Sequence, residues 1–338
     1  MDILYVGPDQ GTSRHRADAL RRLGHRVHLI DPRAGVSRPR WLAQWTWRTG
    51  ALGLEAWLRR QVLGQVPGGT WTVALVDGGE LVGPSLVRAL RERCGAVVSY
   101  NVDDPYGPRD GRRWRLYLRA VPLYDLVVVV RDVNVPEARA AGARRVLRVF
   151  RSADEAAHAP RDLSPAERAR WADAVVFVGT WMPERGPFLA ELLDRGVPLR
   201  IHGDGWARAP EWPRLRGAWR GPALYGGDYV QAIRGAPVSL GLLSKGNRDL
   251  HTQRTMEIPF AGGVLCAERT SEHRALYREG DEAAFWSDAA ECAARCRDLL
   301  GDAAWRTDLA RRGQRRCVAN GHLNERVMER VLCAALAR

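Results

Sequence analysis

The sequence predicts an α/β protein with two doubly wound parallel sheets. Apolar runs that lack polar alternation recur along the chain, residues 124–130 among them, and strands of this kind are buried on both faces of a parallel sheet. Helical periodicity separates the runs, as in other α/β folds. The succession begins again after residue 166, and a chain of 338 residues suits two cores of roughly 150 residues each. We therefore expect two facing Rossmann-like domains with a ligand between them.

The first domain is predicted over residues 1–160. Its expected strands cover residues 2–6, 26–31, 71–77, 96–100, 124–130 and 145–150, and its helices cover 14–23, 83–93 and 135–141. An aromatic-rich helical segment at 41–66 carries Trp41, Trp45, Trp47 and Trp57. Aromatic side chains bury large apolar areas, so we expect this segment to pack in the core, with an apolar ligand groove as the alternative.

Residues 7–13 form a loop at the carboxyl end of the first expected strand. Gly7 and Gly11 stand alone, so the GxGxxG fingerprint of dinucleotide-binding proteins is absent. Ligands bind at the carboxyl ends of parallel strands, which makes Asp9, Thr12 and Ser13 candidate substrate-binding residues. A helix N-cap is the alternative role for Thr12 or Ser13.

The fourth expected strand runs into Asp103-Asp104-Pro105. Adjacent carboxylates are unfavourable unless one is hydrogen-bonded or has a raised pKa, and a carboxylate in that condition can act as a general base or orient a hydroxyl. An Asp-Asp-Pro turn can also begin a helix. The position at the end of a strand favours the functional interpretation of Asp103 and Asp104.

The second domain is predicted over residues 166–318, after a linker at 159–165 that its prolines and polar residues indicate. Strands are expected at 174–178, 198–202, 238–243 and 264–266, with helices at 187–195, 288–299 and 303–318. The remaining segment, 319–338, contains a last expected helix at 323–337.

Asp249 and Glu257 lie eight positions apart, a little over two helical turns, so one helix face would present both carboxylates to one ligand. The helix is expected to start near Thr252, which can cap it. Its amide groups together with Arg254 would then favour a phosphate, and Glu257 would accept hydrogen bonds from two sugar hydroxyls. An amphipathic helix whose acids face water is the alternative.

Asp249, Arg254, Glu257 and Gly262-Gly263 resemble the donor-site segment of GT-B glycosyltransferases, in particular of the CgeB-like (spore-maturation-protein type) family. The stretches FVGTWMPER at 177–185 and IHGDGW at 201–206 resemble that family as well, as does Asp103-Asp104-Pro105. The resemblance covers about residues 174–325 closely and residues 1–160 in the order of elements. The first acid is Asp249 where the family usually has Glu, which leaves its role open.

The resemblance implies a glycosyltransferase that moves a sugar from a nucleotide-diphosphate sugar to a hydroxyl acceptor, with a final helix at 319–338 that returns to the first domain. Asp103, Asp104 or Asp9 would orient or deprotonate the acceptor hydroxyl. Lys245, the sole lysine, would lie near the phosphates. The implied donor-binding residues are Gly179, Thr180, Arg185, His202, Gly203, Lys245, Thr252, Arg254 and Glu257.

We expect neither a metal ion nor a cofactor beyond the nucleotide sugar. Arg254 or Lys245 would neutralise the departing diphosphate, and the chain lacks a DxD element with the flanks typical of metal-using transferases. A nucleotide-sugar epimerase on the same fold and a non-catalytic structural or interaction protein are the alternatives. The sequence indicates neither the nucleotide, the sugar nor the acceptor, which can be a glycan, a protein or a small natural product.

The net charge of +13 raises the question of a nucleic-acid partner. The arginines are scattered along the chain rather than clustered, so we expect no nucleic-acid binding. No apolar run reaches the roughly 18 residues of a membrane span, and the chain starts without a signal-like segment, so we expect a cytoplasmic protein. The six cysteines have no CxxC spacing and are predicted to be reduced and structural.

Overall fold

The computed structural model describes residues 1–37 and 40–337. These residues form two compact units. The first contains residues 1–150, Gly246–Arg248 and the chain from Asn324 onward, and the second contains Arg151–Lys245 and Asp249–Leu323. The change of unit at Phe150 precedes the predicted linker at 159–165, because Arg151 and Ser152 are already bonded to residues of the second unit.

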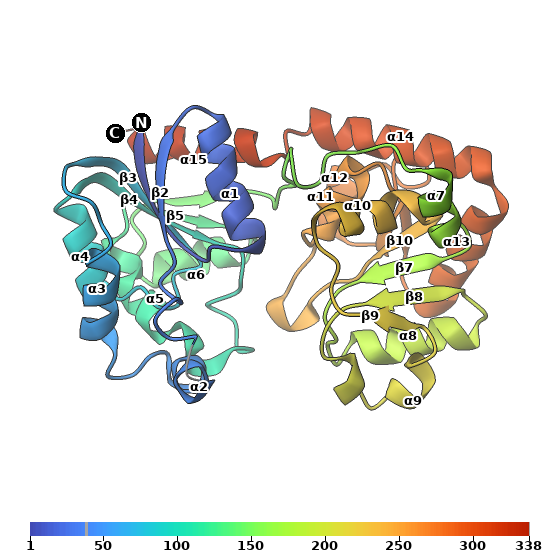
Figure 1. Ribbon diagram of the computed structural model, residues 1–338, viewed down its shortest axis with the longest axis horizontal. Coiled ribbons are helices and arrows are strands. Elements are labelled where there is room, and N and C mark those ends of the chain that lie inside the picture. The colour runs from blue at the N-terminus through green and yellow to red at the C-terminus, as the bar shows by residue number, and fades with distance from the viewer. Residues whose placement is uncertain (38–39, 338) are drawn as a thin grey trace. The chain divides into compact units, whose positions relative to one another are not determined.

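The first unit is built on a six-stranded, all-parallel sheet with the strand order β2-β1-β3-β4-β5-β6 (Figure 1). Each expected strand of this unit is present, with bounds that differ by a few residues at most. The strands are β1 Asp2–Val6, β2 Arg26–Ile30, β3 Trp71–Asp77, β4 Cys94–Asn101, β5 Leu126–Val129 and β6 Val146–Arg148.

Helices cover both faces of this sheet, because successive strand residues point to opposite sides. Ile3 and Tyr5 pack toward α1 and α15, whereas Leu4 and Val6 pack toward α4, α5 and α6. The doubly wound arrangement of the first unit is thus confirmed. The helices are α1 Gly11–Arg22, α2 Arg40–Thr49, α3 Glu55–Leu63, α4 Pro84–Arg91, α5 Arg115–Ala120, α6 Asn134–Ala140 and α15 Asn324–Leu336, with 3₁₀ turns at Gly111–Trp114 and Val121–Leu123.

The expectation that the tryptophans of residues 41–66 pack in the core is wrong for three of the four. Trp41, Trp45 and Trp47 on α2 are 68%, 45% and 51% exposed. Only Trp57 packs against a small cluster of buried side chains. The segment also breaks between α2 and α3, where Ala51 has a positive φ of 57° that ends a helix. α2 therefore presents an aromatic surface.

The second unit has its own six-stranded parallel sheet, in the order β12-β11-β10-β7-β8-β9. The expected strands are again present, and two short edge strands, β9 and β12, are additional. The bounds are β7 Val175–Val178, β8 Leu199–His202, β9 Trp219–Gly221, β10 Val238–Gly241, β11 Leu265–Glu268 and β12 Ala284–Trp286.

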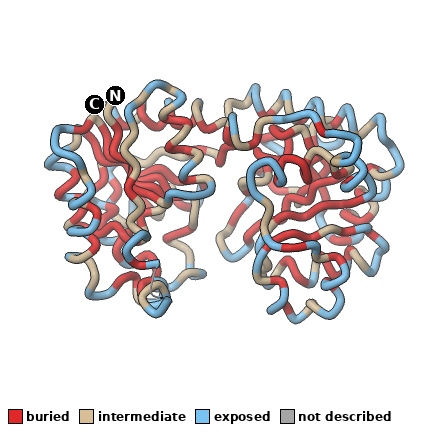
Figure 2. The backbone as a smooth tube through the Cα atoms, viewed as in Figure 1, coloured by how far each residue is buried: buried red, intermediate tan, exposed pale blue. Residues whose placement is uncertain are grey.

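Helices α8, α9, α13 and α14 pack on one face of the second sheet around the buried strand residues. The strands run through the buried interior of this unit (Figure 2). α7 starts at Pro165 inside the predicted linker and is held by a capping box between Ser164 and Glu167. The helices are α7 Pro165–Trp171, α8 Arg185–Asp194, α9 Trp212–Leu215, α10 Gly226–Gly235, α11 Arg254–Phe260, α12 Ser271–Leu276, α13 Ala289–Gly301 and α14 Ala303–Ala319, with 3₁₀ turns at Trp206–Arg208 and Lys245–Asn247.

A pair of parallel, doubly wound sheets is the α/β fold class that the sequence predicts. Among the described residues, none of the helices has the length and apolar character that a membrane crossing requires.

Candidate functional site

The carboxyl ends of β7 and β8 meet through Gly179 and Gly203. Gly203 has a φ of +147°, and a Cβ atom there would lie 2.0 Å from the carbonyl oxygen of Gly179, so only glycine fits. The N–H of Gly179 donates to the carbonyl of His202 at 2.8 Å, and the N–H of Gly203 donates to Gly221 at 3.0 Å. The N–H of Gly179 is therefore engaged within the sheet, and the implied contact of Gly179 with the donor remains a prediction.

Thr180 follows β7 directly, and Arg185 at the start of α8 holds its backbone. The guanidinium of Arg185 donates to the carbonyls of Thr180 at 2.9 Å, Leu242 at 3.2 Å and Leu243 at 3.1 Å. Arg185 is buried, and these bonds tie the loop after β7 to the loop after β10. In this structure the side chain orders two loops, and the implied role of Arg185 in binding the donor remains a prediction.

Lys245 stands at the carboxyl side of β10 with a side chain that is 62% exposed. Its ammonium lies 3.4 Å from a carboxylate oxygen of Glu268, and its backbone N–H donates to Glu184 at 2.9 Å. These residues line a cavity of about 40 Å³ together with Arg185 and Trp286. Lys245 is thus an exposed cation whose side chain can turn to a ligand anion. The bonds of Arg185 tie the loop that contains Lys245 to the loop that contains Thr180.

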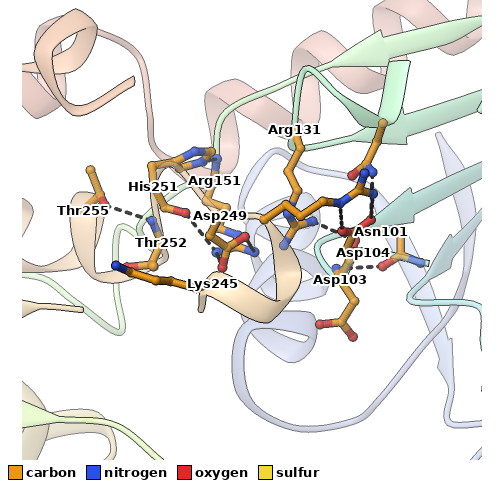
Figure 3. A network of polar contacts seen from close by, with 12 residues as sticks. Asn101, Asp103, Asp104, Arg131, Arg151, Lys245, Asp249, His251, Thr252 and Thr255 are labelled. Atoms are coloured by element: carbon orange, nitrogen blue, oxygen red, sulfur yellow. Dashed lines mark hydrogen bonds and ion pairs between the residues drawn. The ribbon is translucent and has the colours of Figure 1, made fainter. Parts of the chain in front are cut away.

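Asp249 does not share a helix with Glu257, because α11 begins only at Arg254. The carboxylate of Asp249 is buried against the guanidinium of Arg151, with bonds of 3.2 and 3.3 Å (Figure 3). The expectation that both acids address one ligand from one helix face is therefore wrong. Asp249 neutralises a buried arginine instead, since a buried charge requires a partner.

His251 continues this buried network. Its Nε2 accepts a hydrogen bond from the backbone N–H of Arg151 at 3.1 Å, so the proton lies on Nδ1, which donates to Glu272 at 2.5 Å. The orientation of Asp249, Arg151 and His251 is visible in Figure 3. The network joins the start of the second unit to the segment that leads into α11.

Thr252 does not cap α11. The N-cap position is occupied by Gln253, whose side chain makes no capping bond, and the N–H of Thr252 donates to the hydroxyl of Thr255 at 3.0 Å (Figure 3). The hydroxyl of Thr252 is buried without a hydrogen-bond partner. Buried hydroxyls normally have a partner, so Thr252 is a candidate ligand contact through its side chain rather than through a helix cap.

Glu257 is buried and has three neighbours in the second unit. The hydroxyl of Tyr229 donates to it at 2.8 Å, Arg254 lies at 3.3 Å, and His158 Nε2 lies at 3.4 Å. The Nδ1 atom of His158 accepts from the backbone N–H of Asp154 at 2.9 Å, so the proton on Nε2 points to the carboxylate. Burial and the nearby Glu257 charge raise the pKa of Tyr229, which keeps it a donor.

Arg254 joins Glu257 to the end of β7. Its Nε donates to the carbonyl of Val178 at 3.2 Å, and its side chain remains about one-third exposed. The guanidinium also lies over the ring of Tyr229, 5.4 Å from the centroid. Arg254 is thus tied to the residue that precedes Gly179, and Glu257 lies beside Arg254.

His202 ends β8 and is buried beside Trp171, with a ring separation of 5.6 Å. Burial lowers the pKa of His202, so the imidazole is neutral at pH 7. Its Nδ1 is buried without a hydrogen-bond partner. The structure leaves this atom available for a hydrogen bond, whereas the His202 carbonyl is already bonded to Gly179.

The three predicted acceptor-side acids lie in the first unit and differ in their surroundings. Asp104 is buried and accepts bonds of 2.6 and 2.7 Å from Arg248 and of 2.8 Å from Asn134. Burial alone would raise the pKa of the Asp104 carboxyl, but these hydrogen bonds outweigh it and lower the pKa. A carboxylate with a lowered pKa is a poor base, so the prediction of Asp104 as a base is not favoured.

Asp103 has a side chain that is 37% exposed, with the nearest cation at 3.7 Å in Arg113. Its backbone is fixed by Asn101, which accepts from its N–H, and by Arg131, which donates to its carbonyl at 2.8 Å (Figure 3). Asp9 lies after β1, half-exposed and paired with Arg14 at 2.6 Å. Of the three acids, Asp103 therefore has the most distant cation partner.

Three cysteines meet in the core of the second unit. The Sγ atoms of Cys266, Cys292 and Cys296 lie within 4.8 Å of one another, and this is the one potential metal-binding group found among the described residues. Structural zinc sites use four ligands, and these thiols are fully buried in the apolar core. They are free cysteines. Cys292 and Cys296 lie on α13 and Cys266 lies on β11.

Several residues of the site were missed by the sequence analysis. Arg151, His158, Tyr229 and Arg248 bond to predicted residues that lie far away in the chain, and no local pattern marks them. Arg248 also has a positive φ of 55°, and it binds both Asp104 and Glu137. Arg248 thus belongs to the first unit, whereas Lys245, which is expected near the phosphates, belongs to the second.

Comparisons with known proteins concern the family and the fold. Residues 185–333, less than half of the chain, match the model of a family described as glycosyl transferase-like. No curated protein sequence matches the chain.

Solved structures resemble the chain over almost its whole length. The HepE protein of Anabaena in complex with UDP-glucose shares 12% identity, with a TM-score of 0.66 and coverage of 99% of this chain and 98% of that one. Sucrose-phosphate synthase from Thermosynechococcus elongatus shares 13%, with a TM-score of 0.67 and 98% of each chain covered. An E. coli trehalose-6-phosphate protein bound with UDP-2-fluoro glucose shares 13%, with a TM-score of 0.62 and 98% of each chain covered. The fold is therefore the GT-B fold of glycosyltransferases.

Proposed function

We propose that the protein is a glycosyltransferase that moves a sugar from a nucleotide-diphosphate sugar to a hydroxyl acceptor. The observation that carries the proposal is the convergence at the carboxyl edge of the second sheet. There Thr180, Lys245, Arg254 and Glu257 come from three separate segments that hydrogen bonds tie together. The match of residues 185–333 to the glycosyl transferase-like family supports it.

The donor residues have complementary chemistry. The carboxylate of Glu257 can accept hydrogen bonds from two ribose hydroxyls, because Tyr229 and His158 fix its orientation. Lys245 and Arg254 supply two cations for the diphosphate, one exposed and one about one-third exposed. HepE and the E. coli protein were solved with UDP-glucose and UDP-2-fluoro glucose, so we propose UDP as the first nucleotide to test.

In the transfer, the bond between the anomeric carbon and the diphosphate oxygen breaks while a bond to the acceptor oxygen forms. The negative charge that develops on the diphosphate would be stabilised by Lys245 and Arg254, as fixed cations stabilise a transition state. We propose that no metal ion is needed for this step. Asp103 would take up the proton of the acceptor hydroxyl.

Calorimetric titration with UDP, GDP and dTDP, with and without EDTA, tests the donor site. We expect one nucleotide to bind with an affinity that EDTA does not change. Binding that requires a divalent cation would contradict the metal-independent proposal. Failure of all three nucleotides to bind would contradict the glycosyltransferase proposal and favour a non-catalytic protein, whereas conversion of the donor to another nucleotide sugar without an acceptor would indicate an epimerase.

A further inference from the structure

A cavity of about 240 Å³ lies within the first unit, outside the donor residues. Its lining comes from the segment after β2, from α2, from the turn after β3 and from the 3₁₀ turn after β4, and it includes Arg33, Val36, Trp47, Glu80, Leu81 and Arg113. The strands involved end at Ile30, Asp77 and Asn101. The cavity thus stands at the carboxyl edge of the sheet, where doubly wound sheets bind their ligands.

One wall of the cavity is aromatic and fixed in place. The guanidinium of Arg113 stacks on the ring of Trp47 at 4.0 Å and on the ring of Trp114 at 4.5 Å. Trp114 is buried, whereas half of Trp47 is exposed. Trp47 is therefore an indole held in one orientation with surface left for a ligand, and its electron-rich face attracts the weakly positive C–H groups of a ring.

The charged side chains at the cavity form an ion-pair network. Glu80 accepts bonds from Arg33 at 2.8 Å and from Arg113 at 2.5 Å, and Arg113 also donates to Asp110 at 2.9 Å. Both arginines are thus already paired with carboxylates. An anionic ligand would have to displace a carboxylate from its arginine. Hydroxyl groups can instead donate to the carboxylates and accept from the guanidinium groups without breaking these ion pairs.

The network also connects the cavity to the proposed base. Arg113 lies 3.7 Å from the carboxylate of Asp103, and Asp103 is partly exposed. The polar groups of a ligand stacked on Trp47 would therefore lie beside the linked side chains of Glu80, Arg113 and Asp103. The cavity is smaller than the roughly 300–1,000 Å³ of pockets for drug-sized ligands, so one ring fits better than two.

We infer that this cavity is the acceptor subsite and that it takes an uncharged sugar ring, which stacks on Trp47 and whose hydroxyls bond to Glu80 and the arginines. The inference rests on the proposed glycosyltransferase function and assigns the class of its acceptor. A phosphorylated sugar does not suit arginines that are already paired with carboxylates, and a purely apolar ring would leave the bonding capacity of Arg33, Glu80 and Arg113 unused.

The test is saturation-transfer NMR on the full chain with methyl β-glucopyranoside, methyl β-galactopyranoside, methyl α-mannopyranoside, glucose 6-phosphate and 4-nitrophenol. We expect at least one methyl glycoside to bind the parent and the Trp41→Ala variant equally, and to bind Trp47→Ala at least tenfold more weakly. Trp41 is the matched control because it lies on the same helix, is 68% exposed and does not line the cavity.

A second variant tests the charge argument. Glu80→Gln removes the carboxylate that lines the cavity and pairs with Arg33, so we expect weaker glycoside binding and new binding of glucose 6-phosphate. The inference is overturned if no methyl glycoside shows binding that depends on Trp47, or if the parent prefers glucose 6-phosphate or 4-nitrophenol to all three glycosides. Nucleotide titration of the same samples reports on the proposed function separately, because no cavity residue belongs to the second unit.

Discussion

Replacement of Glu257 by glutamine is expected to weaken nucleotide binding without unfolding the protein. The glutamine has the same shape, and its amide oxygen can still accept the 2.8 Å bond from Tyr229, but its NH2 group then faces the N–H of His158 at 3.4 Å. Arg254 also loses its charged partner at 3.3 Å, and because Glu257 is buried this costs more than the roughly 0–1 kcal/mol of an exposed pair. We therefore expect a variant that is folded but less stable than the parent.

The effect on binding is larger because the ribose hydroxyls lose a charged acceptor. A hydrogen bond to a charged group contributes about 1.5–3 kcal/mol, so the loss of one such bond raises the Kd for UDP by about 10- to 150-fold. Calorimetric titration measures the Kd, and urea unfolding of the same samples measures the stability.

Asp173→Asn serves as the control for this experiment. It is the same acid-to-amide change in the same unit, but Asp173 precedes β7 and pairs with Arg200 at the other edge of the sheet. We expect its Kd to equal that of the parent. A Glu257→Gln variant that is folded and binds UDP as tightly as Asp173→Asn would refute the assignment of Glu257 to the nucleotide.

Asp103→Asn should leave the Kd for UDP unchanged and lower the turnover number by about 10²- to 10⁴-fold, the usual effect of losing a general base; equal turnover in a steady-state assay would exclude Asp103 as the base. Asp77→Asn should lower the free energy of unfolding by about 3–5 kcal/mol in urea, because Arg16 loses its buried partner at 2.7 Å; an unchanged urea midpoint would contradict this. Burial lowers the pKa of His273 from 6.5 to about 4, so between these values the unfolded chain binds the extra proton and stability falls as the pH drops, by about 3 kcal/mol in all. The stability difference between the parent and His273→Gln should shrink by this amount from pH 7 to pH 4, and a constant difference would exclude the effect.

The secondary structure was largely predictable because buried parallel strands are continuous apolar runs. The run at 71–77 gives a strand with the predicted bounds, and the run at 124–130 gives β5. The short edge strands β9 and β12 were missed, since three residues carry no periodic signal. The start of α11 was misplaced because the stretch from Asp249 to Gln253 is compatible with a helix, and its bonds to Arg151 and Thr255 decide otherwise.

The sequence predicted which residues are candidates for the site, but not which other residues bond to them. The sequence analysis named Glu257 and Asp104, yet it could not show that Tyr229 and Arg248 bond to them. Arg248 and Asp104 are 144 positions apart, and a local pattern carries no information about contacts at that distance. These partners bear on the choice of base that we propose, because Arg248 bonds to both oxygens of Asp104 and lowers its pKa.

The exposure of Trp47 could not be predicted from the sequence for a similar reason. Aromatic residues at helical spacing normally indicate a core-facing helix, but α2 presents Trp41, Trp45 and Trp47 on its surface. The stacking of Arg113 on Trp47 is a contact between separate segments, and the spacing of the tryptophans does not reveal it.

The most direct test of the proposed function is the release of nucleotide from UDP-glucose, UDP-galactose, GDP-mannose and dTDP-glucose in the presence of the three methyl glycosides, with the product identified by mass spectrometry. We predict nucleotide release from one donor, a product one hexose heavier than the glycoside, and the loss of both in Asp103→Asn. Recovery of every donor and glycoside unchanged, from a protein that binds neither UDP, GDP nor dTDP, would contradict the assignment of the second unit as a nucleotide-sugar site.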